Sequence, residues 1–126
     1  MGWSQRFASL DSNADMTVGI IGLGYVGLPT AIGFHDAGFT VWGVDVSQRT
    51  VDMVKAGKNP TGDPDVDNIV PQPGSERWHI TTSTAEAVPQ CDIVLVTVPT
   101  PVTHELKPDL SYVEAAGKAV FEAIPK

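Results

Sequence analysis

A row of three glycines directly after a short apolar run constrains this chain more than any other feature. In the stretch VGIIGLGYVGLPTA, Gly22, Gly24 and Gly27 form the pattern Gly-x-Gly-x-x-Gly. The β-branched run at 18–21 predicts a strand buried on both faces, and the pattern over 26–37 predicts a helix. A glycine turn between a strand and a helix is the setting in which this pattern binds a dinucleotide.

Each glycine has a different physical role in such a turn. Gly22 permits the tight turn, Gly24 lets the backbone approach a pyrophosphate, and Gly27 allows the helix to pack closely on the strand. The phosphates would lie on the free N–H groups of Tyr25 and Val26, at the positive end of the helix dipole. Because these donors are backbone groups, a chain with a net charge of −7 can still bind an anion. A turn that serves packing alone is the alternative.

An acidic residue stands where the second strand of such a unit ends. Asp45 closes the predicted strand 39–45, eighteen positions after Gly27, near the spacing of about 20 expected for the acid that binds the ribose hydroxyls. Its carboxylate would repel a 2′-phosphate, which favours NAD over NADP. Arg49 could instead favour NADP by binding the 2′-phosphate. The alternatives are that Arg49 pairs with Asp45 or that it is a solvated helix residue. Asp45 could also cap the next helix, although Ser47 fills that role better.

Strands and helices continue to alternate along the chain. The further predicted strands cover 39–45, 78–82 and 92–98, the last being the clearest buried strand, and further helices begin at the caps Ser47, Ser83 and Asp109. This order predicts an α/β fold, a Rossmann-like doubly wound parallel sheet with right-handed crossovers. We expect the sheet to be truncated after about four strands. Strand 92–98 would then be a bare apolar edge that pairs with another chain, or the last helix would swap into a neighbour.

A proline-marked turn, VPTP, follows the last predicted strand. It would lie at the carboxyl edge of the sheet, where open α/β sheets bind their ligands. Thr100 would be presented toward the cofactor, and an ordinary proline turn is the alternative. The complete set of candidate cofactor-binding residues is Gly22, Leu23, Gly24, Tyr25, Val26, Gly27, Asp45, Arg49, Val98, Pro99 and Thr100.

Other chemistry-bearing residues have simpler explanations. Cys91 has no histidine in its own segment to activate it, so it is expected to be a packed residue. His35, His79 and His104 are scattered without ligand spacing, and the acidic stretch at 63–67 lacks the spacing of a calcium loop. Neither a catalytic residue nor a metal site is therefore predicted within the chain.

Composition excludes several classes of partner. The chain has 8 Lys and Arg against 15 Asp and Glu and no basic cluster, which argues against nucleic acid. No apolar run reaches the roughly 18 residues of a membrane span, and residues 1–16 lack the apolar core of a signal peptide. A single cysteine excludes an intrachain disulfide and fits a reducing compartment. We expect residues 1–16 to be a disordered leader and the location to be cytoplasmic.

Several longer stretches share the pattern of one known family. They are IGLGYVGLPTA, VWGVDVSQRTVDMV, ITTSTAEAVPQCDIVLVTVPTPV and KPDLSYVEAA. Together they resemble the N-terminal part of the UDP-glucose/GDP-mannose dehydrogenase family, over about residues 17–124. VPTP followed by PDLSYVE is similar to UDP-N-acetylmannosamine and related N-acetylhexosamine dehydrogenases. The chain departs from the family after its second helix, where GDPDVD replaces the usual Glu-Pro-Gly-Leu.

The resemblance implies a reaction and a set of roles. Members of the family use NAD in two successive oxidations that take the C6 alcohol of a nucleotide sugar to a carboxylate, through an aldehyde-level thioester. The resemblance assigns pyrophosphate contacts to Tyr25 and Val26, the ribose ligand to Asp45 and the cofactor contact after the fourth strand to Thr100. Many members have a basic residue five positions after the acid, where this chain has Thr50, so a ribose contact by Arg49 departs from that pattern.

The resemblance also implies that much of the enzyme is missing. We expect the family's catalytic cysteine and lysine to lie beyond residue 126, together with its central and C-terminal sugar-binding domains. Cys91 does not match the motif of the catalytic cysteine. Residues 17–126 are then a partial NAD-binding domain, catalytically incomplete alone, from a homo-oligomeric enzyme with a nucleotide-sugar substrate. The alternatives are a stand-alone NAD-sensing regulatory module, which needs about six strands, and a small methyltransferase.

Overall fold

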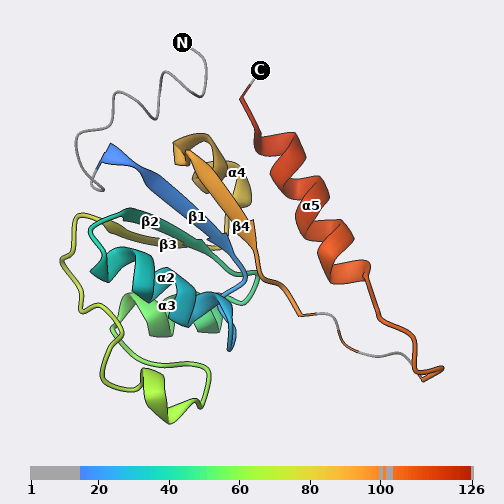
Figure 1. Cartoon of the computed structure of the whole chain (residues 1–126), viewed down its shortest axis with the longest axis horizontal. Coiled ribbons are helices and arrows are strands. Elements are labelled where there is room, and N and C mark those ends of the chain that lie inside the picture. Colours follow the sequence, from blue (N-terminus) through green and yellow to red (C-terminus); the bar gives the residue numbers. More distant parts are fainter. Residues whose placement is uncertain (1–14, 100, 102–103, 126) are drawn as a thin grey trace.

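Four parallel strands form a sheet in the order β3-β2-β1-β4 (Figure 1). The strands are β1 (Thr17–Ile21), β2 (Thr40–Val44), β3 (Trp78–Thr81) and β4 (Ile93–Val96). The computed structural model describes residues 15–99, 101 and 104–125. This strand order confirms the predicted Rossmann-like sheet, because it places β1 between β2 and β4, where the direction of winding reverses.

The helical elements connect the strands and cover both faces of the sheet (Figure 1). In chain order they are α2 (Gly27–Asp36), α3 (Gln48–Lys55), η2 (Pro64–Val66), α4 (Thr84–Ala87), η3 (Val88–Gln90) and α5 (Ser111–Ala123). The two η elements are single turns of 3₁₀ helix. Each predicted strand and helix is thus present. β2, β3 and β4 are shorter than the runs that predicted them, and β1 begins one residue earlier than predicted.

One face of the sheet, covered by α2 and α3, holds the main core. Val18 and Ile20 of β1 lie in one cluster with Leu28 and Ile32 of α2, and all four side chains are at most 1% exposed. Burial of side chains of this size contributes about 1.5–3 kcal/mol each. This cluster therefore fixes α2 against the strand that precedes it.

The opposite face is less deeply buried. Its core consists of Ile21, Val44 and Ala87, with half-buried side chains from α5 packed against them. No residue of α5 is itself buried, and Phe121 on this helix is 80% exposed. Apolar packing therefore holds α5 only weakly.

Asp109 precedes α5 in the chain. Its carboxylate accepts hydrogen bonds from the N–H and hydroxyl of Ser111, and these bonds lower the pKa of that carboxyl.

β4 is an edge strand in the described part of the chain. It pairs with β1 alone, and Ile93 and Val96 are 37% and 41% exposed. The prediction that 92–98 is the clearest buried strand is therefore wrong, because no described strand pairs with the second edge of β4. The predicted bare apolar edge is present instead.

Ser47 and Ser83 both cap helices as predicted, but the predicted capping box between Ser83 and Glu86 is incomplete. Ser47 accepts a hydrogen bond from the N–H of Thr50 at 3.2 Å, and Ser83 accepts one from the N–H of Glu86 at 3.1 Å. In a complete capping box, the N–H of Ser83 would donate to the Glu86 carboxylate. The hydroxyl of Thr81 takes both of those partners, donating to Glu86 and accepting from the Ser83 N–H.

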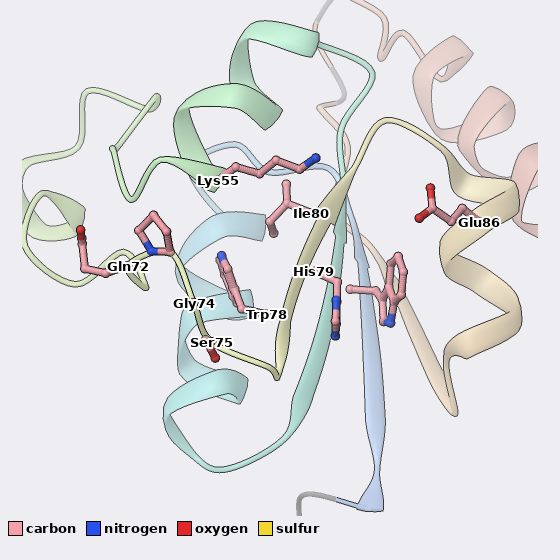
Figure 2. Close-up of a pocket in the computed structure, with 10 residues that line it drawn as sticks. Lys55, Gln72, Gly74, Ser75, Trp78, His79, Ile80 and Glu86 are labelled. Carbon is pink, nitrogen blue, oxygen red and sulfur yellow. The ribbon is translucent and has the colours of Figure 1, made fainter.

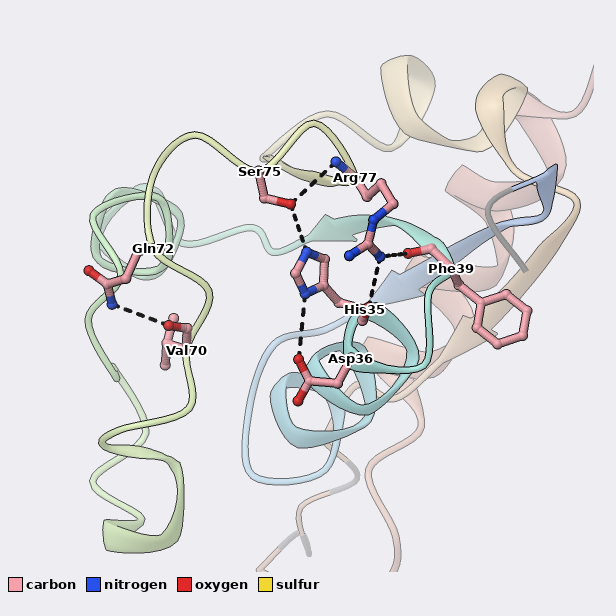
Figure 3. Close-up of polar contacts among 7 residues, drawn as sticks. All are labelled: His35, Asp36, Phe39, Val70, Gln72, Ser75 and Arg77. Carbon is pink, nitrogen blue, oxygen red and sulfur yellow. Dashed lines mark hydrogen bonds and ion pairs between the residues drawn. The ribbon is translucent and has the colours of Figure 1, made fainter. Parts of the chain in front are cut away.

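A polar network ties the C-terminus of α2 to the segment before β3 (Figure 3). One guanidinium nitrogen of Arg77 donates to the carbonyl oxygens of His35 at 2.8 Å and Phe39 at 3.0 Å. Nε2 of His35 lies 2.7 Å from Oγ of Ser75, and its Nδ1 lies 3.6 Å from the carboxylate of Asp36. Arg77 thus joins the last turn of α2 to the residue before β2, and it adds a donor to the His35 carbonyl, which also accepts from the N–H of Gly38 at 3.0 Å.

The centre of the sheet contains a close approach between Gly19 of β1 and Cys91. A β-carbon placed on Gly19 would lie 2.7 Å from Sγ of Cys91 but 3.5 Å from its Cβ. The thiol donates to the carbonyl oxygen of Ala87 at 3.2 Å, and burial, aided by the nearby Asp92 carboxylate, raises its pKa to about 11. Cys91 is therefore a packed residue, as predicted, and a β-carbon at position 19 would require its Sγ to shift.

We expect Gly19→Ala to lower the free energy of unfolding by about 1–3 kcal/mol, because the new methyl group overlaps Sγ of Cys91. Adding Cys91→Ala should restore most of this loss, since only a Cβ at ordinary contact distance remains. Urea unfolding of the two single variants and the double variant measures the coupling. Additive losses in the double variant would contradict the prediction.

Candidate functional site

A pocket of about 660 Å³ opens at the carboxyl ends of β1, β2 and β4. The predicted residues that line it are Gly22, Leu23, Gly24, Tyr25, Val26, Asp45, Val98 and Pro99. The other lining residues are Ile21, Val44, Val46, Thr84, Thr97, Tyr112, Ala115, Ala116 and Ala119. Parallel α/β sheets bind ligands at this edge, beside the point where the winding reverses.

The three glycines of the turn are placed in three different ways. Gly22 has a φ of +101°, and a β-carbon on it would lie 3.0 Å from the carbonyl carbon and oxygen of Thr97. A β-carbon on Gly27 would overlap the carbonyl oxygen of Gly22. A β-carbon on Gly24, in contrast, would meet no atom within 4 Å. The fold itself therefore requires Gly22 and Gly27, whereas Gly24 leaves room beside the backbone for a ligand.

The N-terminus of α2 opens onto the pocket. The N–H of Leu28 donates to the carbonyl of Gly24 at 3.1 Å, which closes the first helical turn. Among the described residues, none accepts a hydrogen bond from the N–H of Tyr25 or Val26, and these residues are 69% and 65% exposed. Two free donors thus lie at the positive end of the helix dipole, an arrangement that suits a pyrophosphate.

Asp45 connects the end of β2 to the glycine turn. Its Oδ2 accepts a hydrogen bond from the N–H of Leu23 at 2.9 Å, and its Oδ1 accepts one from the N–H of Ser47 at 2.9 Å. Each carboxylate oxygen has a second lone pair, and Asp45 lines the pocket. The side chain can therefore hold the turn and accept hydrogen bonds from a diol at the same time.

Two of the described site residues that the sequence predicted fall outside the pocket lining. Gly27 lies behind the turn, where it allows the close approach of α2. Arg49 is exposed on α3 and is not among the lining residues. Thr100 lies outside the described residues.

Sequence reasoning missed one wall of the pocket and one residue at its base. The wall is the face of α5 that carries Tyr112, Ala115, Ala116 and Ala119. Small residues at helical spacing were the available signal, but they are equally typical of ordinary packing. Thr97 lies at the base, one residue before the VPTP turn, and its hydroxyl donates to the carbonyl of Gly22 at 2.8 Å. No local pattern distinguishes this threonine from others on strands.

A second cavity, of about 370 Å³, lies at the outer edge of β3 (Figure 2). Lys55 and Trp78 lie on one side of the strand, and the stacked rings of Trp42 and His79, 4.7 Å apart, lie on the other. It shares no lining residue with the first pocket. It is therefore a feature separate from the candidate site.

In the described part of the chain, no group of three or more His, Cys, Asp and Glu residues is placed to hold a metal ion. No helix there is long and apolar enough to cross a membrane.

The parallel sheet, the glycine turn and the acid at the end of β2 together define a dinucleotide-binding domain of the Rossmann class. A family model described as "UDP-glucose/GDP-mannose dehydrogenase family, NAD binding domain" matches residues 16–126. The chain therefore belongs to this family, and its cofactor is NAD. This confirms the resemblance found in the sequence.

Curated relatives include enzymes that act on N-acetylated sugars. The chain is 38% identical over 110 residues to an NDP-N-acetyl-D-galactosaminuronic acid dehydrogenase of Ralstonia nicotianae, covering 87% of this chain and 25% of the relative. It is 38% identical over 111 residues to a UDP-N-acetyl-D-mannosamine dehydrogenase of Salmonella typhimurium, covering 87% and 26%. The chain thus spans about a quarter of the length of the curated relatives it matches.

Solved structures give the same family. A GDP-mannose dehydrogenase from Pseudomonas aeruginosa superposes with a TM-score of 0.81 at 33% identity, over 86% of this chain and 25% of that one. A UDP-glucose dehydrogenase from Pyrobaculum islandicum superposes with a TM-score of 0.76 at 35% identity, over 83% and 24%. The fold is therefore shared by family members named for different sugars.

Substitutions at Gly24 and Gly27 should have different effects, one on NAD affinity and the other on the stability of the fold. Gly24→Ala should change the free energy of unfolding by less than about 0.5 kcal/mol yet weaken NAD binding at least about tenfold, because the methyl group occupies the space where the pyrophosphate would lie. Gly27→Ala should instead destabilise the fold by about 3 kcal/mol, because its methyl group overlaps a backbone oxygen. Urea unfolding and calorimetric titration separate the two effects. Wild-type NAD affinity in Gly24→Ala would contradict this assignment.

Proposed function

We propose that this chain is the NAD-binding part of an enzyme that oxidises the C6 alcohol of a nucleotide sugar to a carboxylate. The carrying observation is the bond that joins Asp45 to the N–H of Leu23, because it places a ribose acceptor and a phosphate-binding turn on one pocket. NAD, when bound, accepts the hydride in each oxidation. The chain's own residues supply binding and orientation.

The proposed division of work within the site follows the geometry. The free N–H groups of Tyr25 and Val26 bind the pyrophosphate, and Gly24 leaves the space that it needs. Asp45 accepts hydrogen bonds from the adenosine ribose. Val98 and Pro99 form the neighbouring wall at the end of β4, and we assign Thr100 to the cofactor by its place in the VPTP motif.

We further propose a UDP-linked N-acetylhexosamine as the substrate of the whole enzyme. The support is that relatives at 36–38% identity are named as dehydrogenases of N-acetylated mannosamine or galactosamine derivatives. Their greater length supports placing the sugar-binding domains in a further part of the protein, with residues 17–126 forming part of the NAD-binding domain. A stand-alone NAD-sensing module, the other candidate, has no support from these comparisons.

The catalytic cysteine and lysine of the family are proposed to lie outside residues 1–126. Cys91 is unsuited to the role because it precedes β4, at the end of the strand opposite the pocket, and because burial raises the pKa of its thiol to about 11. A nucleophilic cysteine needs an accessible thiolate near neutral pH. The proposed location is cytoplasmic, which the single free thiol favours.

Calorimetric titration with NAD, ADP-ribose and NADP tests the cofactor assignment. NAD and ADP-ribose should bind, and NADP should bind at least about tenfold more weakly, because the Asp45 carboxylate repels a 2′-phosphate. Asp45→Asn, which keeps the size of the side chain and removes its charge, should reduce this preference. Equal affinity for NAD and NADP in the wild type would overturn the role of Asp45. Absence of NAD binding at millimolar concentration would overturn cofactor binding by this chain.

We also propose that the 126-residue chain, taken by itself, pairs with a second copy through the open edge of β4. The support is that β4 has one described partner strand and keeps Ile93 and Val96 partly exposed. Unpaired N–H and C=O groups on such an apolar edge are a template for another strand.

Light scattering coupled to size-exclusion chromatography tests this pairing. The wild-type chain should run as a dimer, and Ile93→Lys should run as a monomer, because a charge on the edge opposes pairing. Ile69→Lys is the matched control, since Ile69 is 47% exposed on a loop away from β4 and its variant should remain dimeric. A monomeric wild-type chain would contradict the proposal.

A further inference from the structure

A single peptide unit of the glycine turn is held from both sides. The carbonyl oxygen of Gly22 accepts a hydrogen bond from Oγ1 of Thr97 at 2.8 Å. The N–H of Leu23, at the other end of the same peptide, donates to Oδ2 of Asp45 at 2.9 Å. Asp45 follows β2 and Thr97 follows β4, the two strands that flank β1. The turn is thus fixed by a side chain from each neighbouring strand.

The Thr97 hydroxyl is confined to this position. The N–H of Thr97 donates to the carbonyl of Ile21 at 2.8 Å, which continues the pairing of β4 with β1. The hydroxyl also lies 3.2 Å from that carbonyl, so its shorter bond is the one to Gly22. The α-carbon of Gly27 lies close to both oxygens. A β-carbon at position 27 would overlap the Gly22 carbonyl oxygen and Thr97 Oγ1.

Because residue 22 is a glycine, the orientation of the Gly22–Leu23 peptide depends on the side chains of Asp45 and Thr97. With a φ of +101° and no β-carbon, Gly22 alone does not restrict how the following peptide is oriented. A rotation of that peptide would turn the N–H of Leu23 away from Asp45 and shift the free N–H groups of Tyr25 and Val26 that come next. Orientation of those donors therefore depends on hydrogen bonds at the two ends of one peptide.

We propose that Thr97 is a positioning residue for the cofactor, acting through the carbonyl of Gly22. Together with Asp45, its hydroxyl sets the orientation of the Gly22–Leu23 peptide and so aims the N–H groups of Tyr25 and Val26 at the pyrophosphate. The inference rests on the proposed cofactor site, and it adds a residue that binds no part of the nucleotide itself. A threonine that served packing alone would affect stability and leave affinity unchanged.

Substitutions that separate the hydroxyl from the volume of the side chain test this role. Thr97→Val removes the hydroxyl at nearly constant volume, and Thr97→Ser keeps it. Thr40→Val is the matched control, because Thr40 is a half-buried strand residue at the opposite end of the sheet. Calorimetric titration with NAD and urea unfolding are measured on the wild type and on each variant of the 126-residue chain.

We expect Thr97→Val to weaken NAD binding about tenfold, consistent with loss of one hydrogen bond that orients the turn. Thr97→Ser and Thr40→Val should stay within about twofold of the wild type. Thr97→Ala is a further variant, which carries no extra methyl group against the Gly22 oxygen, and it should weaken binding as Thr97→Val does. Wild-type affinity in Thr97→Val or in Thr97→Ala, or an equal loss in Thr97→Ser, would overturn the proposal.

A readout without cofactor separates this inference from the proposed function. In amide hydrogen exchange followed by NMR, the N–H of Leu23 should exchange at least about tenfold faster in Thr97→Val than in the wild type, because the peptide no longer stays aligned with Asp45. Failure of the wild type to bind NAD would refute the cofactor role of this chain while leaving the Leu23 measurement decisive for the peptide. Unchanged exchange at Leu23 would overturn the role of Thr97.

Discussion

The carbonyl oxygen of Gly22 lies so close to the α-carbon of Gly27 that no side chain fits between them. This contact sets where α2 leaves the sheet, because the helix begins at Gly27 itself. Leu28 and Ile32 can then reach the main core while the N-terminus of α2 still faces the pocket. Burial of the helix and exposure of its first N–H groups thus follow from one steric restriction.

Parallel strands extend this restriction to distant parts of the chain. Because their carboxyl ends meet at one edge, residues that follow β1, β2 and β4 become neighbours there. Asp45 reaches the turn across 22 residues of sequence, and Thr97 reaches it across 75. The site is therefore assembled by strand order, and its polar bonds also tie three strands together where the sheet would otherwise fray.

Local patterns in the sequence predicted what depends on neighbouring residues in the chain. The turn at Gly22, the acid at Asp45 and the cap at Ser47 each obey a spacing rule, and the alternation of elements predicts the strand order. Features that depend on contacts across the sheet were missed. The apolar run of β4 looks like a buried strand, but its burial depends on a second partner strand, and Thr97 differs from other strand threonines only in what lies opposite it.

The loosely packed helix α5 has a consequence for the energetics of any ligand in the pocket. It supplies the wall that carries Tyr112 and Ala116, yet none of its residues is buried. A helix held in this way detaches at a lower free-energy cost than the core elements need to unfold. A ligand that contacts this wall must select the docked arrangement, so the apparent affinity is scaled by the fraction of molecules in which α5 is docked.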